Sequence, residues 1–171
     1  MIGPSEQMVS SEWIPAEATL WEESTPSETS ILVVEDEGIV ATDLGHRLER
    51  MGYHVAAIVG TGQDAVDQAH AKEPDLILMD IMLRGDIRGT QAAHIIRSEM
   101  EVPIVFLTAY SDDSTIRQAR LTQPYGYLPK PFGEDVVKTT ISVALYKHRT
   151  DVRMKEQRDW LDSVLNSVAR L

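Results

Sequence analysis

The chain has 171 residues, of which 43% are hydrophobic, and this is enough for one domain of about 100–150 residues with tails. It has no cysteine, which excludes a disulfide framework or a thiolate metal site and fits a reducing compartment. No apolar run approaches the roughly 20 residues needed to cross a bilayer, and no signal peptide is predicted. We therefore expect a cytoplasmic chain that makes no membrane contact.

The formal net charge of −11 is concentrated at the start of the chain. The first 30 residues are rich in Ser, Thr, Pro and Glu, and they contain six glutamates without any Lys, Arg or Asp. Because they show no sustained periodicity, we expect residues 1–30 to form a flexible acidic leader. The chain contains no basic stripe, which argues against nucleic-acid binding.

Short apolar runs alternate with helical patterns from Ile31 onward. Each run is apolar enough for a strand that is buried on both faces. The expected strands lie, in chain order, at residues 31–34, 53–59, 76–79, 104–107 and 125–128. Between them, apolar residues at helical spacing predict helices with these core positions: Val40, Leu44 and Leu48; Ala65, Val66 and Ala69; Ala92, Ile95 and Ile96.

Local signals predict where these helices begin and end. Gly52 suits the left-handed conformation that closes the first helix, and Pro74 stops the second. Ser111 is expected to cap the fourth helix. A fifth helix is expected over residues 134–148, with these residues on its apolar face: Val136, Val137, Ile141, Ala144 and Leu145.

Five strands that alternate with five helices predict an α/β fold with a parallel sheet covered on both faces. Such sheets bind ligands outside the carboxyl ends of their strands. The residues that directly follow the strands are therefore the candidate functional residues. They are Glu35, Asp36 and Glu37 after the first strand, Asp80 after the third, Thr108 after the fourth and Lys130 after the fifth.

These residue types together favour phosphoryl chemistry. Converging carboxylates repel one another unless a cation is present, and Mg²⁺ prefers one or two carboxylates together with phosphate oxygens. An aspartate such as Asp80 can act as a nucleophile and become an aspartyl phosphate. The ammonium of Lys130 would neutralise charge on the transferring group, and the Thr108 hydroxyl could donate a hydrogen bond to it.

Four segments resemble the receiver domains of response regulators in two-component signalling. The resemblance covers roughly residues 31–145 and is carried by these segments: Val33-Val34-Glu35-Asp36-Glu37, Leu78-Met79-Asp80, Phe106-Leu107-Thr108-Ala109 and Tyr127-Leu128-Pro129-Lys130-Pro131-Phe132. It implies a doubly wound, flavodoxin-like fold of five parallel strands in the order 2-1-3-4-5. It also implies a domain that accepts a phosphoryl group from a histidine kinase or a phosphotransfer protein and is not itself an enzyme.

The resemblance also implies individual roles on the metal side of the site. Asp80 is similar to the phosphoacceptor. Glu35 and Asp36 resemble the acidic pair, in which Asp36 is a direct Mg²⁺ ligand and Glu35 acts through water. The main-chain carbonyl of Met82 resembles the third protein ligand. The expected cofactor is Mg²⁺, with Mn²⁺ as an alternative.

The same resemblance implies a switch on the other side. Thr108 and Tyr127 resemble the pair in which the hydroxyl moves toward the phosphate and the ring turns inward. Lys130 resembles the phosphate-binding lysine, and the Lys130–Pro131 bond is expected to be cis. Phosphorylation would then change the face formed by the fourth helix, the fifth strand and the fifth helix.

The end of the chain predicts a longer helix that needs a partner. Residues 145–171 contain no Pro and no Gly, and apolar residues recur there at a spacing of three to four: Met154, Leu161, Val164, Val168 and Leu171. This spacing is typical of a coiled coil or an amphipathic helix. We therefore expect a receiver domain over 31–148 and a helical extension over 149–171. A homodimer is expected, formed through the face of the fourth helix, fifth strand and fifth helix, through a parallel pairing of this extension, or through both.

Residues 156–168 also resemble the leading helix of PAS-type sensor domains. On this interpretation the chain is the N-terminal receiver of a hybrid sensor histidine kinase. A third candidate, an aspartyl-phosphate phosphatase, is disfavoured because Met82 stands where such enzymes carry a second aspartate. A Rossmann-type nucleotide site is disfavoured because acidic residues, rather than glycines, follow the first strand.

Overall fold

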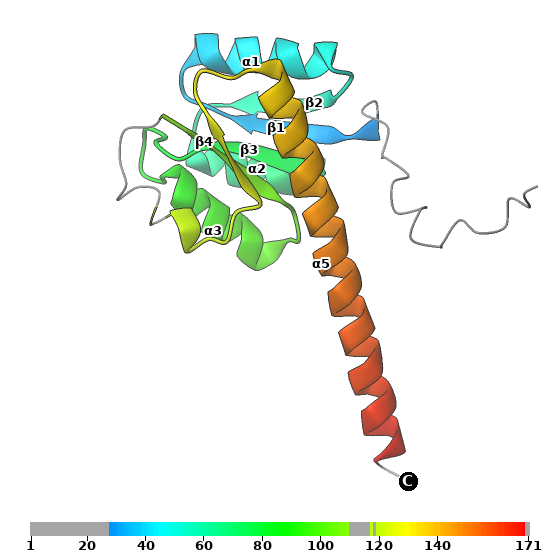
Figure 1. Cartoon of the computed structure of the whole chain (residues 1–171). Helices are drawn as coiled ribbons and strands as arrows, with labels where there is room; N and C mark the ends of the chain where they lie inside the picture. The colour runs from blue at the N-terminus through cyan, green and yellow to red at the C-terminus, as the bar shows by residue number, and fades with distance from the viewer. Residues whose placement is uncertain (1–27, 110–116, 118, 170–171) are drawn as a thin grey trace, which may run out of the picture.

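A computed structural model describes residues 28–109, 117 and 119–169 of the chain. Five parallel strands form one sheet in the order β2-β1-β3-β4-β5 (Figure 1), which confirms the expected fold class and strand order. The strands are β1 (Ser30–Val34), β2 (His54–Val59), β3 (Leu76–Asp80), β4 (Ile104–Thr108) and β5 (Gly126–Pro129). Each predicted strand is present, and its ends differ from the prediction by at most one residue.

Helices cover both faces of the sheet (Figure 1). They are α1 (Gly38–Arg50), α2 (Gly62–Lys72), α3 (Gly89–Glu99) and α5 (Glu134–Val168). Alternate residues of each central strand enter opposite cores: Leu32 and Val34 pack with α2 and α3, whereas Ile31 and Val33 pack with α1 and α5. This double burial explains why the strands appear in the sequence as continuous apolar runs.

The helix ends follow the local signals in the sequence. Gly52 has a φ of 91° and closes α1 in the left-handed region, as expected. Glu73, which has a φ of 45°, ends α2 directly before Pro74. The Thr61 hydroxyl accepts a hydrogen bond from the Asp64 main-chain N–H at 3.1 Å and caps the start of α2.

One prediction about the helices differs from the structure, and two others concern residues that the structure does not describe. The sequence predicts Val136 on the apolar face of the fifth helix, but its side chain is half-exposed because it lies to the side of the buried row formed by Val137, Ile141 and Ala144. The predicted cap at Ser111 and the acidic leader, apart from its last residues, lie outside the described ranges, while Arg117, Ala119 and Arg120 are helical.

Helix α5 runs without interruption from the domain into the extension (Figure 1). Its first turns cover the sheet, but beyond Val152 every described residue is exposed. Within the described ranges, no helix is both long and apolar enough to cross a membrane.

A polar cluster joins α5 to the amino ends of the strands. Tyr125, just before β5, donates a hydrogen bond from its hydroxyl to Asp151 Oδ2 at 2.8 Å, and its ring meets the ring of His148 edge to face, with centroids 5.6 Å apart. The guanidinium of Arg97 lies 5.7 Å from the centroid of the Tyr125 ring, and Lys155 forms an ion pair with Glu101. We call these six residues the amino-edge cluster.

Candidate functional site

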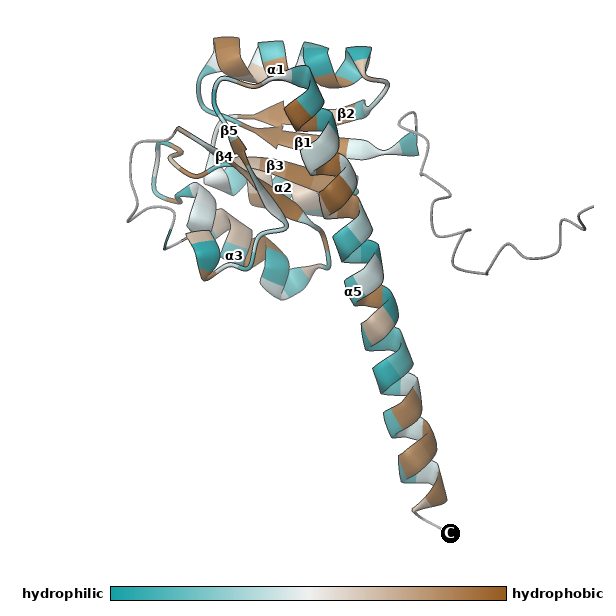
Figure 2. Cartoon of the chain, in the orientation of Figure 1, coloured by the Kyte–Doolittle hydropathy of each residue, from teal (hydrophilic) through white to brown (hydrophobic). Residues whose placement is uncertain are grey.

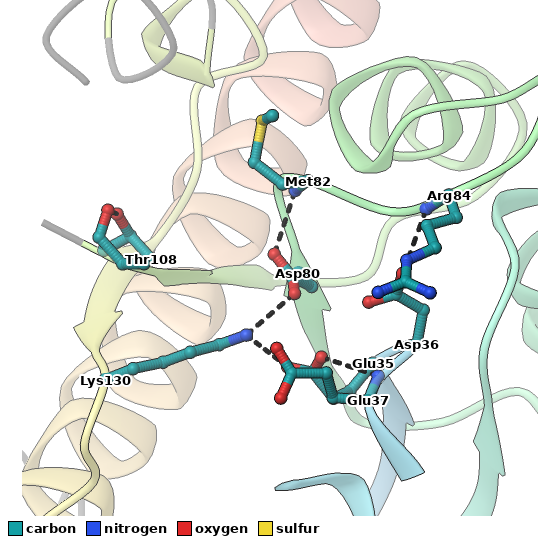
Figure 3. Close-up of polar contacts among 9 residues, drawn as sticks. Glu35, Asp36, Glu37, Asp80, Met82, Arg84, Thr108 and Lys130 are labelled. Carbon is teal, nitrogen blue, oxygen red and sulfur yellow. Dashed lines mark hydrogen bonds and ion pairs between the residues drawn. The ribbon is translucent and has the colours of Figure 1, made fainter. Parts of the chain in front are cut away.

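The candidate site lies at the carboxyl ends of β1, β3, β4 and β5. Parallel strands bring these ends to one edge of the sheet, so residues far apart in sequence meet there. Figure 3 shows Glu35, Asp36, Asp80 and Lys130 pointing toward one another. A cavity of about 240 Å³ opens beside them and is lined by Asp36, Asp80, Met82, Arg84, Thr108 and Lys130, among others.

Asp80 is the last residue of β3 and is only 6% exposed. Its Oδ1 accepts a hydrogen bond from the Met82 main-chain N–H at 2.9 Å, and its Oδ2 accepts one from Lys130 Nζ at 2.8 Å. A Cβ atom on Gly89 would lie 1.8 Å from the carbonyl oxygen of Asp80. Only a glycine at the start of α3 therefore allows the helix to approach this strand end so closely.

Glu35 is the most deeply buried carboxylate of the site, and its side chain is fully covered. Its Oε2 lies 2.6 Å from Lys130 Nζ, and its Oε1 accepts a hydrogen bond from the Glu37 N–H at 3.1 Å. Burial raises the pKa of Glu35 above its ordinary value, although the contact with Lys130 opposes this effect. A nearby cation therefore stabilises the charged form of this buried carboxylate.

Lys130 supplies one such cation and bridges Glu35 and Asp80. Burial by itself lowers the pKa of Lys130, but the hydrogen bonds with the two carboxylates outweigh it and raise the pKa above the ordinary value. The side chain therefore stays an ammonium at neutral pH. The Lys130–Pro131 peptide bond is cis, as the resemblance implied.

Asp36 is held by a different partner. Its Oδ2 lies 3.2 Å from Arg84 Nε and accepts a hydrogen bond from the Arg84 main-chain N–H at 3.3 Å. Carboxylate oxygens of Glu35, Asp36 and Asp80 all lie within 4.8 Å of one another. Three carboxylates so close together match the oxygen ligands that Mg²⁺ prefers, so these residues fit the expected metal.

Thr108 and Tyr127 lie on neighbouring strands at the side of the site. The Thr108 hydroxyl is 3.4 Å from the Ala109 carbonyl oxygen, to which it donates. The ring of Tyr127 packs on that of Phe106, with centroids 6.3 Å apart. Its hydroxyl is buried without a hydrogen-bond partner among the described residues, and burial raises its pKa. The switch role of this pair stays a prediction.

The structure thus brings together the carboxylates and the lysine that the sequence singled out. It places Met82 in the loop beside Asp80, where its N–H contacts the carboxylate; a ligand role for its carbonyl remains a prediction. Arg84, in the loop after β3, is a member of the site that was not predicted from the sequence. The only available signal was its position four residues after Asp80, and that spacing alone does not predict a contact with Asp36.

The fold and this acidic strand edge place the chain in the flavodoxin-like class of α/β proteins. The family model for the response regulator receiver domain matches residues 31–142. The chain therefore belongs to the response regulator receiver family.

Similarity to individual proteins agrees with this assignment. The transcriptional regulatory protein PdtaR of Mycobacterium tuberculosis (strain CDC 1551 / Oshkosh) is 38% identical over 120 residues, which cover 70% of this chain and 58% of PdtaR. The chain thus spans little more than half the length of this relative.

Two solved structures are also similar. One is the signal receiver domain of a modulated diguanylate cyclase from Desulfovibrio desulfuricans G20, with 34% identity and a TM-score of 0.68, covering 71% of this chain and 97% of that one. The other is the N-terminal domain of a response regulator/sensory box/GGDEF 3-domain protein from Carboxydothermus hydrogenoformans, with 37% identity and a TM-score of 0.67, covering 72% and 99%.

Proposed function

We propose that the chain is a phosphoacceptor receiver in which Asp80 takes a phosphoryl group from a histidine kinase or a phosphotransfer protein. The carrying observation is the buried Asp80 carboxylate, held by Lys130 Nζ and the Met82 N–H beside Glu35 and Asp36. These three carboxylates, with the main-chain carbonyl of Met82, would hold Mg²⁺ or Mn²⁺. The metal would supply positive charge that stabilises the transferring phosphoryl group.

The protein's own residues position and neutralise the reacting groups. An Asp80 oxygen forms a bond to phosphorus as the bond from phosphorus to the donor imidazole nitrogen breaks, and the imidazole keeps the electron pair. The N–H of Met82 fixes the orientation of the carboxylate before the reaction. Lys130, already 2.8 Å from Asp80 Oδ2, balances the charge that the phosphoryl oxygens bring.

The signal would leave the site through Thr108 and Tyr127. In the described state the Thr108 hydroxyl contacts the Ala109 carbonyl, so it is available to turn toward a phosphoryl oxygen. That movement would open space for the Tyr127 ring, whose buried hydroxyl lacks a partner among the described residues. The face formed by the fourth helix, β5 and α5 would then change.

An aspartyl-phosphate phosphatase fits the site less well. Such an enzyme needs a general acid near the nucleophile, and the position two residues after Asp80 holds Met82, whose N–H rather than its side chain contacts Asp80. The domain is therefore proposed to act as a switch and not as an enzyme that turns over a substrate.

A simple experiment tests the phosphoacceptor role. Incubation with acetyl phosphate and Mg²⁺ should add one phosphoryl group of about 80 Da to the intact chain. Asp80→Asn should show no such adduct, whereas Asp86→Asn, which neutralises an exposed aspartate of the following loop, should behave like the wild type. Chelation of the metal should prevent the adduct. An unchanged adduct on Asp80→Asn would disprove the assignment.

The extension of α5 is proposed to pair with a second copy of the chain. Its apolar residues follow coiled-coil spacing and are exposed: Met154, Leu161, Val164 and Val168. In Figure 2, brown hydrophobic bands recur along the part of α5 beyond the sheet. Leu161→Glu with Val164→Glu should convert a dimer to a monomer in light scattering. Ser163→Glu, on the same exposed stretch, should not; a chain that is already monomeric would exclude this pairing.

A cytoplasmic receiver that heads a longer signalling protein is the proposed context. One similar structure is the N-terminal domain of a three-domain protein, and the extension of α5 would connect this receiver to a downstream domain. The alternative is a receiver within a hybrid sensor histidine kinase, as the resemblance of residues 156–168 to the leading helix of PAS-type domains suggested. In either case 31–148 would be the receiver and 149–171 the connecting helix.

A further inference from the structure

Arg84 covers Asp36 from the solvent side of the site. Both its main-chain N–H and its Nε contact the same oxygen, Asp36 Oδ2, at 3.3 Å and 3.2 Å. The Asp36 side chain is only 13% exposed, whereas that of Arg84 is 87% exposed. The guanidinium therefore lies against the Asp36 carboxylate (Figure 3) and shields a side chain that is mostly buried.

The two cations of the site divide the three carboxylates between them. Lys130 forms ion pairs with Glu35 and Asp80, whereas Asp36 is neutralised by Arg84. Without a bound metal, each member of the carboxylate cluster thus has a positively charged partner, which relieves the repulsion that such close carboxylates would otherwise experience.

These contacts differ in how easily they can be broken. Lys130 is largely buried, with a side chain that is 19% exposed, and it bridges two carboxylates. Arg84 is attached through a solvated ion pair, and such pairs contribute little to stability. Its guanidinium can therefore move into solvent at low cost while its main-chain N–H continues to hold Asp36.

We propose that Arg84 is a built-in counter-ion of Asp36 that a divalent cation must displace, so that this side chain weakens metal binding and sets its affinity. The inference rests on the proposed metal site. A cation ligated by Asp36 would lie beside the carboxylate that Arg84 Nε now contacts, and a guanidinium held a few ångströms from a divalent ion is repelled by it. Arg84 thus holds the Asp36 carboxylate in place until metal arrives.

The proposal predicts metal affinity directly, without any reaction. Calorimetric titration of the full chain with MgCl₂, and in parallel with MnCl₂, should give about three- to tenfold tighter binding for Arg84→Gln than for the wild type. Arg84→Lys keeps the charge and the main-chain contact and should stay near the wild type. Because exposed ion pairs are screened by salt, the gain should shrink as KCl is raised from low to high concentration.

A matched control separates this local effect from net charge. Arg153→Gln removes one positive charge from an exposed position on α5, outside the residues that line the site cavity, and should leave the affinity unchanged. Equal or weaker binding by Arg84→Gln, or an equal gain in Arg153→Gln, would overturn the proposal. A wild type that is phosphorylated on Asp80 and binds Mg²⁺, while Arg84→Gln binds it no better, would refute the role of Arg84 alone. A wild type that neither binds the metal nor accepts the phosphoryl group would refute the proposed function as well.

Discussion

The two ends of the strands carry polar clusters of opposite character. At the carboxyl ends, three carboxylates lie within 4.8 Å of one another and share two cations, the buried Lys130 and the exposed Arg84, which leaves one negative charge in excess. In the amino-edge cluster, by contrast, the two cations Arg97 and Lys155 equal in number the two carboxylates Glu101 and Asp151. Each of these four charged side chains contacts another member of the cluster. The cavities beside them are similar, about 240 Å³ and 300 Å³. Excess charge, rather than cavity size, therefore distinguishes the site that needs a ligand.

His148 is a packing group within the amino-edge cluster. Its ring packs against Tyr125, its Nε2 is buried without a hydrogen-bond partner within the described ranges, and burial lowers its pKa. The imidazole therefore remains neutral at physiological pH and acts as a packing group. This cluster fastens α5 to the sheet at the point where the helix leaves the domain.

The largest expected effect tests how tightly the carboxyl-end site is built. Gly89→Ala would place a Cβ atom 1.8 Å from the Asp80 carbonyl oxygen, so α3 and the end of β3 must move apart. We expect a loss of about 2–3 kcal/mol in the free energy of unfolding, measured with urea.

Gly38→Ala is the control for that substitution. It also changes a glycine near the start of a helix beside the site, but an added Cβ would meet no atom within 4 Å. Its stability should be unchanged or slightly increased, since alanine favours the helix. Equal effects of the two substitutions would show that close approach to Asp80 is not what glycine at position 89 provides.

The sequence predicted the carboxyl-end site far better than the amino-edge cluster. The site follows from topology: the residues after parallel strands must meet, so Asp36, Asp80 and Lys130 could be placed together without coordinates. The contacts of Tyr125 with His148 and Asp151 depend instead on the rotation and the path of α5 as it leaves the sheet. No local pattern in the sequence specifies these, and the same is true of the loop that brings Arg84 to Asp36.

A smaller effect tests the excess negative charge at the site. Burial raises the pKa of Glu35 above its ordinary value of 4.5, so the folded state binds this proton more tightly than the unfolded state. The wild type therefore loses stability as pH rises from about 4.5 through the folded pKa of Glu35. Glu35→Gln lacks this titration, and its stability relative to the wild type should rise over the same range, in urea unfolding with a chelator present.

Glu134→Gln supplies a control of opposite sign. Arg50 lowers the pKa of Glu134, so the wild type gains stability as pH rises toward the ordinary pKa of a glutamate. The stability of Glu134→Gln relative to the wild type should therefore fall over that range. A relative stability of Glu35→Gln that stays flat or falls with rising pH would mean that the carboxylate is already fully compensated. The distinction between the two clusters would then fail.

The smallest expected effect concerns the amino-edge cluster and asks whether the two ends of the strands are independent. Burial, and after it the hydrogen bond to Asp151, raises the pKa of Tyr125 to about 12, and Tyr125→Phe removes that hydrogen bond. We expect a loss of about 1 kcal/mol and faster hydrogen exchange around residues 148–155, whereas Ser142→Ala on the same helix should change neither. Mg²⁺ affinity should be the same in Tyr125→Phe and the wild type, because the balanced cluster only fastens the helix. A changed metal affinity would instead mean that the contact between Tyr125 and Asp151 belongs to the route by which the site controls α5, since any coupling between two sites must act in both directions.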